Sequence, residues 1–138
     1  MEVLGAGMNQ IARLDHNDGK QRSYMAATMI GDLVFPCGQI PVDAEGNTPK
    51  SISEQTELCL ANLSKSLKRA GSSLGSILQI TVYLAHIDDF EEYDSAYRKS
   101  FDQLPLPPRT TLFVQGFRGE KRIELTAIAA KENREQGS

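Results

Sequence analysis

Alternation of apolar and polar side chains along the chain predicts several β-strands. Residues 79–85 alternate at every second position, as expected for a strand with one buried face. Two further runs, 24–30 and 33–39, flank Gly31 and Asp32, a pair that favours a tight hairpin turn. These patterns predict a β-hairpin near the N-terminus and a separate strand in the middle of the chain.

Shorter runs add strands at both ends of this series. Residues 11–14 are expected to form a short edge strand, and the last two strands are expected at 110–114 and 122–130. Pro36 cannot donate a hydrogen bond to a ladder, so its strand must lie at an edge or contain a bulge there. Gly38, two residues later, would let a ligand approach the backbone.

Two segments have the period of amphipathic helices. Ser51 and Glu54 have the spacing of a capping box, and the leucines that follow repeat every three or four residues until Gly71. Asp88 and Glu91 repeat this capping pattern at the start of a second helix. The order β-β-β-α-β-α-β-β predicts an α+β domain with one sheet and both helices on one face.

The pleat of the strands predicts what lies on the other face. If Leu112 faces the helices, Arg109 and Thr111 point away from them, and Glu124 points the same way from the last strand. We therefore expect Arg109 and Glu124 to share a cleft, provided that the last two strands pair antiparallel. The expected outer face is too apolar to be left to solvent, so a second subunit should cover it. Its residues are Thr81, Tyr83, Thr111, Phe113, Glu124 and Thr126.

Composition narrows the functional classes. The 138 residues are enough for a single domain, with segments 1–10 and 132–138 expected to be flexible tails. A net charge of -3 argues against nucleic-acid binding, and no apolar run is long enough to cross a membrane. With no signal peptide and only two cysteines, the protein is expected in the cytoplasm. Two distant histidines give no basis for a metal site.

Arg109 is the first candidate for chemistry. Pro105, Pro107 and Pro108 stiffen the chain just before it, so its planar guanidinium is suited to holding a carboxylate through two parallel hydrogen bonds. A surface salt bridge is the alternative interpretation. Glu124 alone is equally well explained as an exposed strand carboxylate.

The two cysteines offer weaker candidates. Cys37 is interpreted as lining a pocket, because the sequence provides no base to activate it as a nucleophile. Cys59, close to the apolar stripe of the first helix, is interpreted as a small buried hydrophobic residue.

Several segments together resemble the reactive-intermediate deaminase family, also called the Rid, YjgF-type, RidA-like or endoribonuclease L-PSP family. The resemblance covers roughly residues 11–131 and keeps the order and spacing of its motifs. These are Gly38-Gln-Ile-Pro41, Gln55, Ala70-Gly71, Thr81-Val82-Tyr83-Leu84, Asp89-Phe90, Tyr97-x-x-x-Phe101, Pro107-Pro-Arg109 and Ile123-Glu-Leu-Thr-Ala-Ile-Ala129.

This resemblance implies a chorismate-mutase-like fold with one mixed sheet, a homotrimer, and active sites at the subunit interfaces. It also implies a hydrolase that acts on C=N bonds, converting reactive enamine and imine acids such as 2-aminoacrylate to 2-keto acids and ammonia. No cofactor is implied, and the implied partners are small imino and keto acids, not nucleic acid or membranes.

Carried over by position, Arg109 matches the family's carboxylate-binding arginine, and Glu124 matches the glutamate beside the attacking water. Tyr24 and Gly38 match residues of the pocket wall. Thr111 stands where the best-studied branch has cysteine and contributes backbone groups. Two departures bear on substrate choice: Cys37 replaces a serine, and Asp94 replaces an asparagine.

Three alternatives remain open at this point. The first is a pathway-specific deaminase of the same fold, of the 2-aminomuconate or pyrimidine-catabolic type. The second is a non-catalytic regulatory trimer that binds small keto acids. The third is ribonuclease activity, which the acidic charge and the absence of a histidine from the expected site disfavour.

Overall fold

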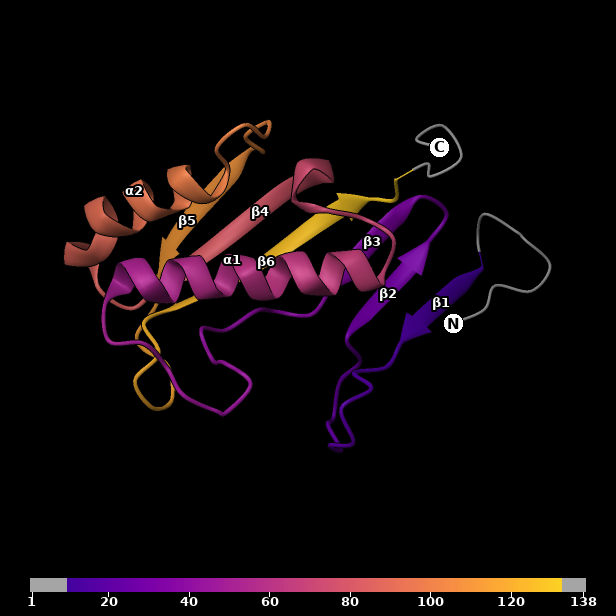
Figure 1. The fold of residues 1–138 in the computed structure, drawn as a ribbon, viewed down its shortest axis with the longest axis horizontal. Coiled ribbons are helices and arrows are strands. Elements are labelled where there is room, and N and C mark those ends of the chain that lie inside the picture. The colour runs from indigo at the N-terminus through magenta and orange to yellow at the C-terminus, as the bar shows by residue number, and fades with distance from the viewer. Residues whose placement is uncertain (1–9, 133–138) are drawn as a thin grey trace.

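The computed structural model describes residues 10–132 and contains one sheet with two α-helices (Figure 1). Most of both expected tails therefore lies outside the described residues. The order of strands and helices is the predicted one, and the α+β class is confirmed. The strands and helices are β1 (Ile11–Leu14), β2 (Ala27–Ile30), β3 (Leu33–Pro36), α1 (Ile52–Arg69), β4 (Ile77–Leu84), α2 (Phe90–Ser100), β5 (Arg109–Phe113) and β6 (Ile123–Ala130), with short 3₁₀ turns at Leu74–Ser76 and Ile87–Asp89.

The six strands lie in the order β1-β2-β3-β6-β4-β5. All neighbouring pairs are antiparallel except β4 and β5, which are parallel. The expectation that the last two strands pair with each other is wrong, because β4 lies between them. A parallel partner needs a long crossover, and α2 provides it between β4 and β5.

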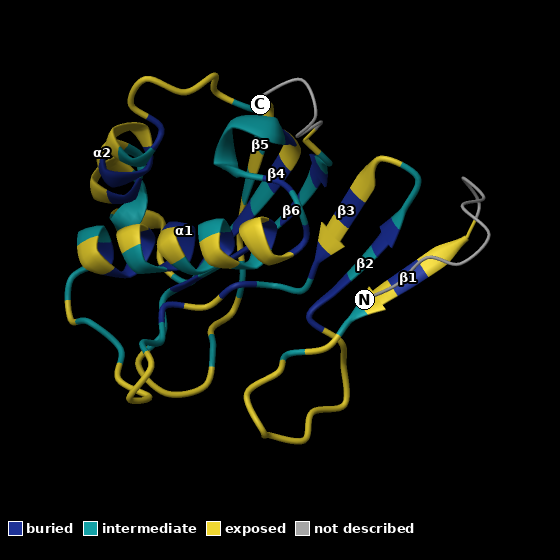
Figure 2. Ribbon diagram, turned by 45° about the vertical axis from the view of Figure 1, so that its right-hand side comes forward, coloured by how far each residue is buried: buried dark blue, intermediate teal, exposed yellow. Residues whose placement is uncertain are grey.

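Both helices cover the same face of the sheet, as Figure 1 shows, and their buried stripes contact the core (Figure 2). Helix α1 begins at Ser51, whose hydroxyl oxygen accepts a hydrogen bond from the backbone N–H of Glu54 at 3.0 Å, as its capping box predicts. The predicted cap of α2 is wrong. Asp89 stands at the N-cap without a side-chain cap, and its carboxylate lies 3.4 Å from Nε of Arg122 instead.

The hairpin of β2 and β3 turns through Gly31 and Asp32 as predicted, with Gly31 at a φ of +55°. β3 is an interior strand, so the edge alternative for Pro36 is wrong. The bulge alternative holds: β3 leaves β6 after Val34, and the chain returns to it only at Gln39. Between these two pairings, the segment from Val34 to Gln39 has one residue more than the facing segment of β6, and this bulge opens the backbone around Gly38.

The predicted orientation of β5 is wrong. Arg109 pairs with Ile80 of β4, whose side chain belongs to the core beneath the helices, so Arg109 and Thr111 face α2. Leu112 pairs with Tyr83 and lies on the other face, where it is 47% exposed. Apolarity misassigns this strand because both faces of the sheet carry apolar residues. For β6 the prediction holds, since Ile123 and Leu125 are buried and Glu124 points away from the core.

The face of the sheet without helices is here called the open face. Its exposed apolar side chains lie on both sides of β6: Leu33 and Phe35 on β3 and Leu112 on β5 are each at least 38% exposed. Neither helix within residues 10–132 combines the length and apolar character that crossing a membrane would require.

Candidate functional site

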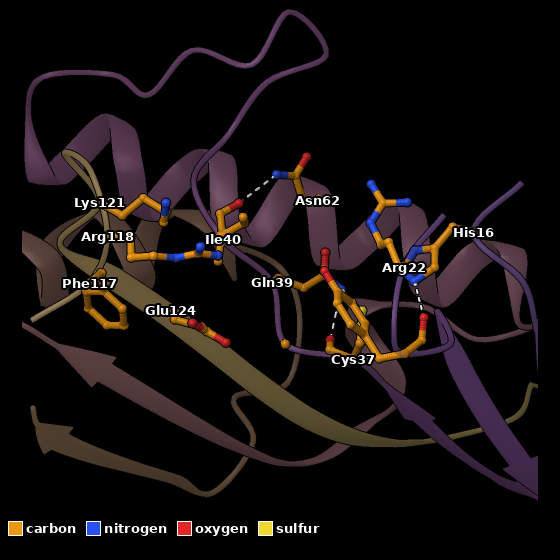
Figure 3. A pocket seen from close by; sticks show the side chains of 12 residues that line it. His16, Arg22, Cys37, Gln39, Ile40, Asn62, Phe117, Arg118, Lys121 and Glu124 are labelled. Atoms are coloured by element: carbon orange, nitrogen blue, oxygen red, sulfur yellow. Dashed lines mark hydrogen bonds between the residues drawn. The ribbon is translucent and has the colours of Figure 1, made fainter. Parts of the chain in front are cut away.

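The predicted site residues divide between two pockets. The first, of about 670 Å³, is lined by Tyr24, Cys37, Gly38 and Glu124 and is here called the Glu124 pocket (Figure 3). The second, of about 240 Å³, is lined by Asp94 and Arg109 together with Tyr97, Arg98, Leu106 and Pro107, and is here called the Arg109 pocket. The structure therefore brings four of the seven candidates together and two others together elsewhere.

The two pockets lie on opposite faces of the sheet. Glu124 pairs with Tyr83 on the open face, whereas Arg109 pairs with Ile80 on the helix-covered face. Since residues directly opposite on neighbouring strands share a face, Arg109 and Glu124 of one chain point in opposite directions. The expectation of a shared cleft therefore fails within a single chain.

Glu124 lies against the bulge that follows β3. A Cβ atom on Gly38 would overlap Oε2 of Glu124, so only a residue without a side chain leaves room for the carboxylate here. Burial raises the pKa of the Glu124 carboxyl, and the positive charge of Lys121 offsets part of this effect. A carboxylate with a raised pKa is a better proton acceptor, which is what a general base requires.

Tyr24 is held at the rim of the Glu124 pocket by His16. Their rings meet edge to face at 5.2 Å, and Nε2 of His16 donates a hydrogen bond to the Tyr24 carbonyl at 2.9 Å. The exposed Tyr24 side chain lines the pocket from this position. His16 also lines it, so the expectation of a site without histidine is wrong.

Cys37 lines the Glu124 pocket, and its carbonyl accepts a hydrogen bond from Nε2 of Gln39 at 2.9 Å. Burial raises the pKa of the Cys37 thiol, with a smaller opposing effect from the charge of Arg22. A raised pKa reduces the thiolate fraction, which agrees with a lining role and argues against a nucleophile. Cys59 is fully buried in the core, as predicted.

Arg109 is held in place by side chains of α2. Its Nη1 lies 2.9 Å from Oδ1 of Asp94, and its guanidinium carbon lies 4.6 Å and 5.2 Å from the ring centres of Tyr97 and Tyr93. Stacking and the ion pair hold the guanidinium plane in one orientation. Asp94 engages only one of its nitrogen atoms, so the other donors of the fork are available to a ligand.

Thr111 lines neither pocket. Its hydroxyl oxygen lies 2.8 Å from the hydroxyl of Tyr93, so its side chain is committed to α2. Burial raises the pKa of Tyr93, and this hydrogen bond opposes the effect. Thr111 therefore supports the aromatic surface on which Arg109 stacks.

The prediction missed three basic residues of the Glu124 pocket. Arg118 and Lys121 come from the loop before β6, and Arg22 comes from the loop before β2. No periodic pattern marks these loops. The only signal in the sequence was the pair of glycines, Gly116 and Gly119, which predicts a tightly turned segment next to a strand that carries a candidate residue. Both glycines have a positive φ in the structure.

Comparison with known proteins identifies the family of this chain. A family model described as "Endoribonuclease L-PSP" matches residues 18–131. A RutC family protein of Saccharolobus solfataricus is 36% identical over 110 residues, which cover 78% of this chain and 86% of the relative. "Putative reactive intermediate deaminase TdcF" of Escherichia coli strain K12 is 30% identical over 127 residues, covering 90% and 98% of the two chains.

Solved structures give the same result. The crystal structure of Escherichia coli TdcF with bound serine superposes with a TM-score of 0.77 at 30% identity, covering 87% of this chain and 94% of that one. The fold is the α+β fold of these solved structures. This chain belongs to the YjgF/Rid family, as its sequence motifs predicted. At the level of the family, the relatives support a deaminase-type function.

Proposed function

We propose that this protein hydrolyses the C=N bond of small 2-imino acids, and of the enamines that tautomerise to them, to give 2-keto acids and ammonia. The observation that carries this proposal is the Glu124 carboxylate, seated against Gly38 in a polar pocket with its pKa raised by burial. A general base beside a space large enough for a small acid and a water is what such a hydrolysis needs. The family's deaminase-type function supports the same reaction class.

The complete site is composite in this proposal: Arg109 of one copy faces Glu124 of a neighbouring copy in a homotrimer. Two features support it. Arg109 and Glu124 of one chain point to opposite faces, so one chain alone cannot bring them to one substrate. The open face also carries the exposed apolar residues Leu33, Phe35 and Leu112, which a second copy would bury.

In this mechanism the Arg109 guanidinium binds the substrate carboxylate and orients the imine carbon. Glu124 takes a proton from a water molecule as the water oxygen forms a bond to that carbon. The π electrons of the C=N bond move to nitrogen, which accepts the proton that Glu124 took from water. Glu124 then takes the hydroxyl proton of the resulting carbinolamine and passes it to the amino nitrogen. The carbonyl forms as the C–N bond breaks, and the electron pair of that bond leaves with nitrogen as ammonia. Water is the only co-reactant.

Arg109 variants test the reaction. Losing one partner of a hydrogen-bonded charge pair costs about 2–5 kcal/mol, which corresponds to about 30-fold or more in rate. We expect Arg109→Ala and Arg109→Lys to lose at least that much keto-acid release, because lysine lacks the planar fork. Arg13→Ala is the matched control, since its exposed side chain on β1 lines neither pocket.

The salt-bridge interpretation of Arg109 predicts a different result. The melting temperature of both Arg109 variants would then fall while keto-acid release per folded protein stayed at the wild-type rate. Measuring both quantities on one preparation, with imines generated from several amino acids, separates the two. Wild-type protein that hydrolyses none of these imines refutes the proposed reaction.

Mixed oligomers test the composite site. Arg109→Ala and Glu124→Gln chains should each be inactive alone. If the site takes one residue from each of two copies, random mixing leaves about a quarter of the sites intact. We therefore expect co-refolded mixtures to recover about a quarter of wild-type turnover. A site within one chain predicts no recovery, and light scattering that shows a monomer at micromolar concentration also contradicts the composite site.

A further inference from the structure

One end of the Glu124 pocket is built by the loop between β5 and β6. Figure 3 shows Arg118 and Lys121 reaching over Glu124 from this loop, with the ring of Phe117 below them. Gly119, at a φ of +72°, turns the backbone between the two basic residues and lets both side chains line the same pocket. Two positive charges therefore meet at the end of the pocket opposite His16 and Arg22.

The loop is anchored on both sides of Lys121. Nε2 of the buried Gln55 donates to the Glu120 carbonyl at 3.1 Å, and its Oε1 accepts from the backbone N–H of Arg122 at 2.8 Å. Gln55 attaches the loop to α1. The Arg122 side chain lies 3.4 Å from Asp89 and adds a second attachment, at the start of α2. A buried amide that satisfies both flanking residues fixes the backbone from which Lys121 extends.

Arg118 and Lys121 differ from Arg22 and Arg109 because their positive charges have no carboxylate partner in the described part of the chain. Arg22 has Asp18 at 2.7 Å and Arg109 has Asp94 at 2.9 Å, so each of these guanidinium groups is compensated. Among residues 10–132, neither Arg118 nor Lys121 has a carboxylate within 4.0 Å. Glu124 is the single acidic residue that lines the pocket, and in the proposed reaction its carboxylate accepts a proton from water.

We propose that Arg118 and Lys121 form a second anion-binding subsite, which selects substrates with a second carboxylate. This inference rests on the proposed function and deepens it. The carboxylate next to the imine binds Arg109 of the neighbouring copy, the reacting carbon lies at Glu124, and the side-chain carboxylate binds between Arg118 and Lys121. The preferred substrates are then imines of acidic amino acids.

Binding of product-like acids tests this subsite without any turnover. 2-Oxoglutarate and 2-oxovalerate have the same chain length and differ in the second carboxylate. A charge-assisted contact is worth about tenfold in affinity, so we expect calorimetry to give at least tenfold tighter binding of 2-oxoglutarate to the wild-type protein. Arg118→Gln with Lys121→Met should abolish this difference and leave 2-oxovalerate binding within about threefold.

Two controls complete the design. Lys68→Met removes one positive charge from an exposed position on α1 that lines neither pocket, and it should preserve the preference. Inorganic phosphate tests whether the Arg118 and Lys121 subsite prefers a carboxylate to another anion. We expect it to compete weakly with 2-oxoglutarate, and competition as tight as 2-oxoglutarate binding itself overturns the assignment to a carboxylate. Equal affinity of the wild-type protein for the two keto acids overturns the subsite.

Turnover separates a failure of this inference from a failure of the proposed function. With imines generated from glutamate and norvaline, the double variant should lower the ratio of the two kcat/KM values about tenfold, because losing the Lys121 charge acts on Glu124 equally for both substrates. Hydrolysis of both imines at ratios that the double variant leaves unchanged overturns the subsite and keeps the reaction. Hydrolysis of neither imine, with 2-oxoglutarate still bound more tightly, overturns the reaction and keeps the subsite.

Discussion

The Arg109 pocket and the Glu124 pocket differ in whether their central charged groups are compensated by an ion pair. Arg109 is neutralised by Asp94 at 2.9 Å and stacked on two tyrosine rings, so its position is fixed before any ligand arrives. In the Glu124 pocket, a carboxylate with a raised pKa lies beside Arg118 and Lys121, and none of these three groups forms an ion pair within 4.0 Å among the described residues. One pocket is preorganised, and the other keeps its charges available for reaction and binding.

The largest effect on activity is expected from Glu124→Gln, which should not lower stability. Glu124→Gln should reduce keto-acid release by about 10²- to 10⁴-fold, the usual contribution of a general base. Because burial raises the pKa of Glu124 above its ordinary 4.5, the folded protein holds this proton more tightly than the unfolded chain. Ionisation of Glu124 therefore opposes folding, and its cost grows as pH rises from about 4.5 through the folded-state pKa.

The glutamine variant lacks this cost, so at pH 7 its melting temperature should equal or exceed that of the wild type. Turnover of the wild type should rise as pH increases through the folded-state pKa of Glu124, since only the carboxylate accepts a proton. Thermal melts at pH 4 to 8 with parallel rates check both signs. A variant that is less stable and still active contradicts the assignment.

Gly38→Ala should have the next largest effect. The new Cβ would overlap Oε2 of Glu124, so the carboxylate must move away from the bulge. A displacement of this kind in a catalytic group costs about tenfold or more in kcat. Gly75→Ala is the matched control, because the nearest atom to its Cβ is 3.7 Å away. Equal rates in both variants would show that Glu124 does not act from this position.

Asp94→Asn tests whether the compensated state of Arg109 limits binding. The Asp94 carboxylate occupies one guanidinium nitrogen, so a substrate carboxylate must share the fork with it. Exposed ion pairs are weak, and we expect the KM for imino acids to fall by about two- to fivefold with kcat unchanged. Asp102→Asn, at an exposed position just after α2, should change neither constant. A higher KM would mean that Asp94 orients Arg109 for its ligand.

The smallest effect is expected at Cys37. Burial raises the pKa of its thiol, so little thiolate is present at neutral pH, and Cys37→Ser should keep turnover within about twofold. Alkylation of the wild-type protein with iodoacetamide at pH 7 should be correspondingly slow. A loss of tenfold or more in the serine variant would assign the sulfur a chemical role.

Local features of this fold could be predicted and long-range ones could not. The turn at Gly31 and the cap at Ser51 depend on neighbouring residues, so the sequence contains all the information that they need. The position of β4 between β5 and β6 depends on pairing between residues 29 to 52 positions apart in the sequence, which periodicity does not reveal. The orientation of Thr111 was missed because both faces of the sheet are apolar there.

The same division applies to the site. Glu124 was found because a clear strand marks its position, and Gly38 because it follows two residues after Pro36. His16, Arg118 and Lys121 reach the pocket from loops, where side-chain direction follows from individual turns and anchoring contacts. Only the folded backbone shows which way these residues point.

The position of β6 also has a consequence for biosynthesis. Among residues 10–132 it is the last strand in the sequence, yet it lies between β3 and β4 and is the one strand of this segment that joins the N-terminal hairpin to the β4-β5 pair. Until residue 130 has emerged, the nascent chain exposes two unpaired strand edges and an incomplete core. The sheet is therefore completed only after residue 130 has emerged, and a ribosome stalled before residue 123 would present a chain that chaperones must protect from aggregation.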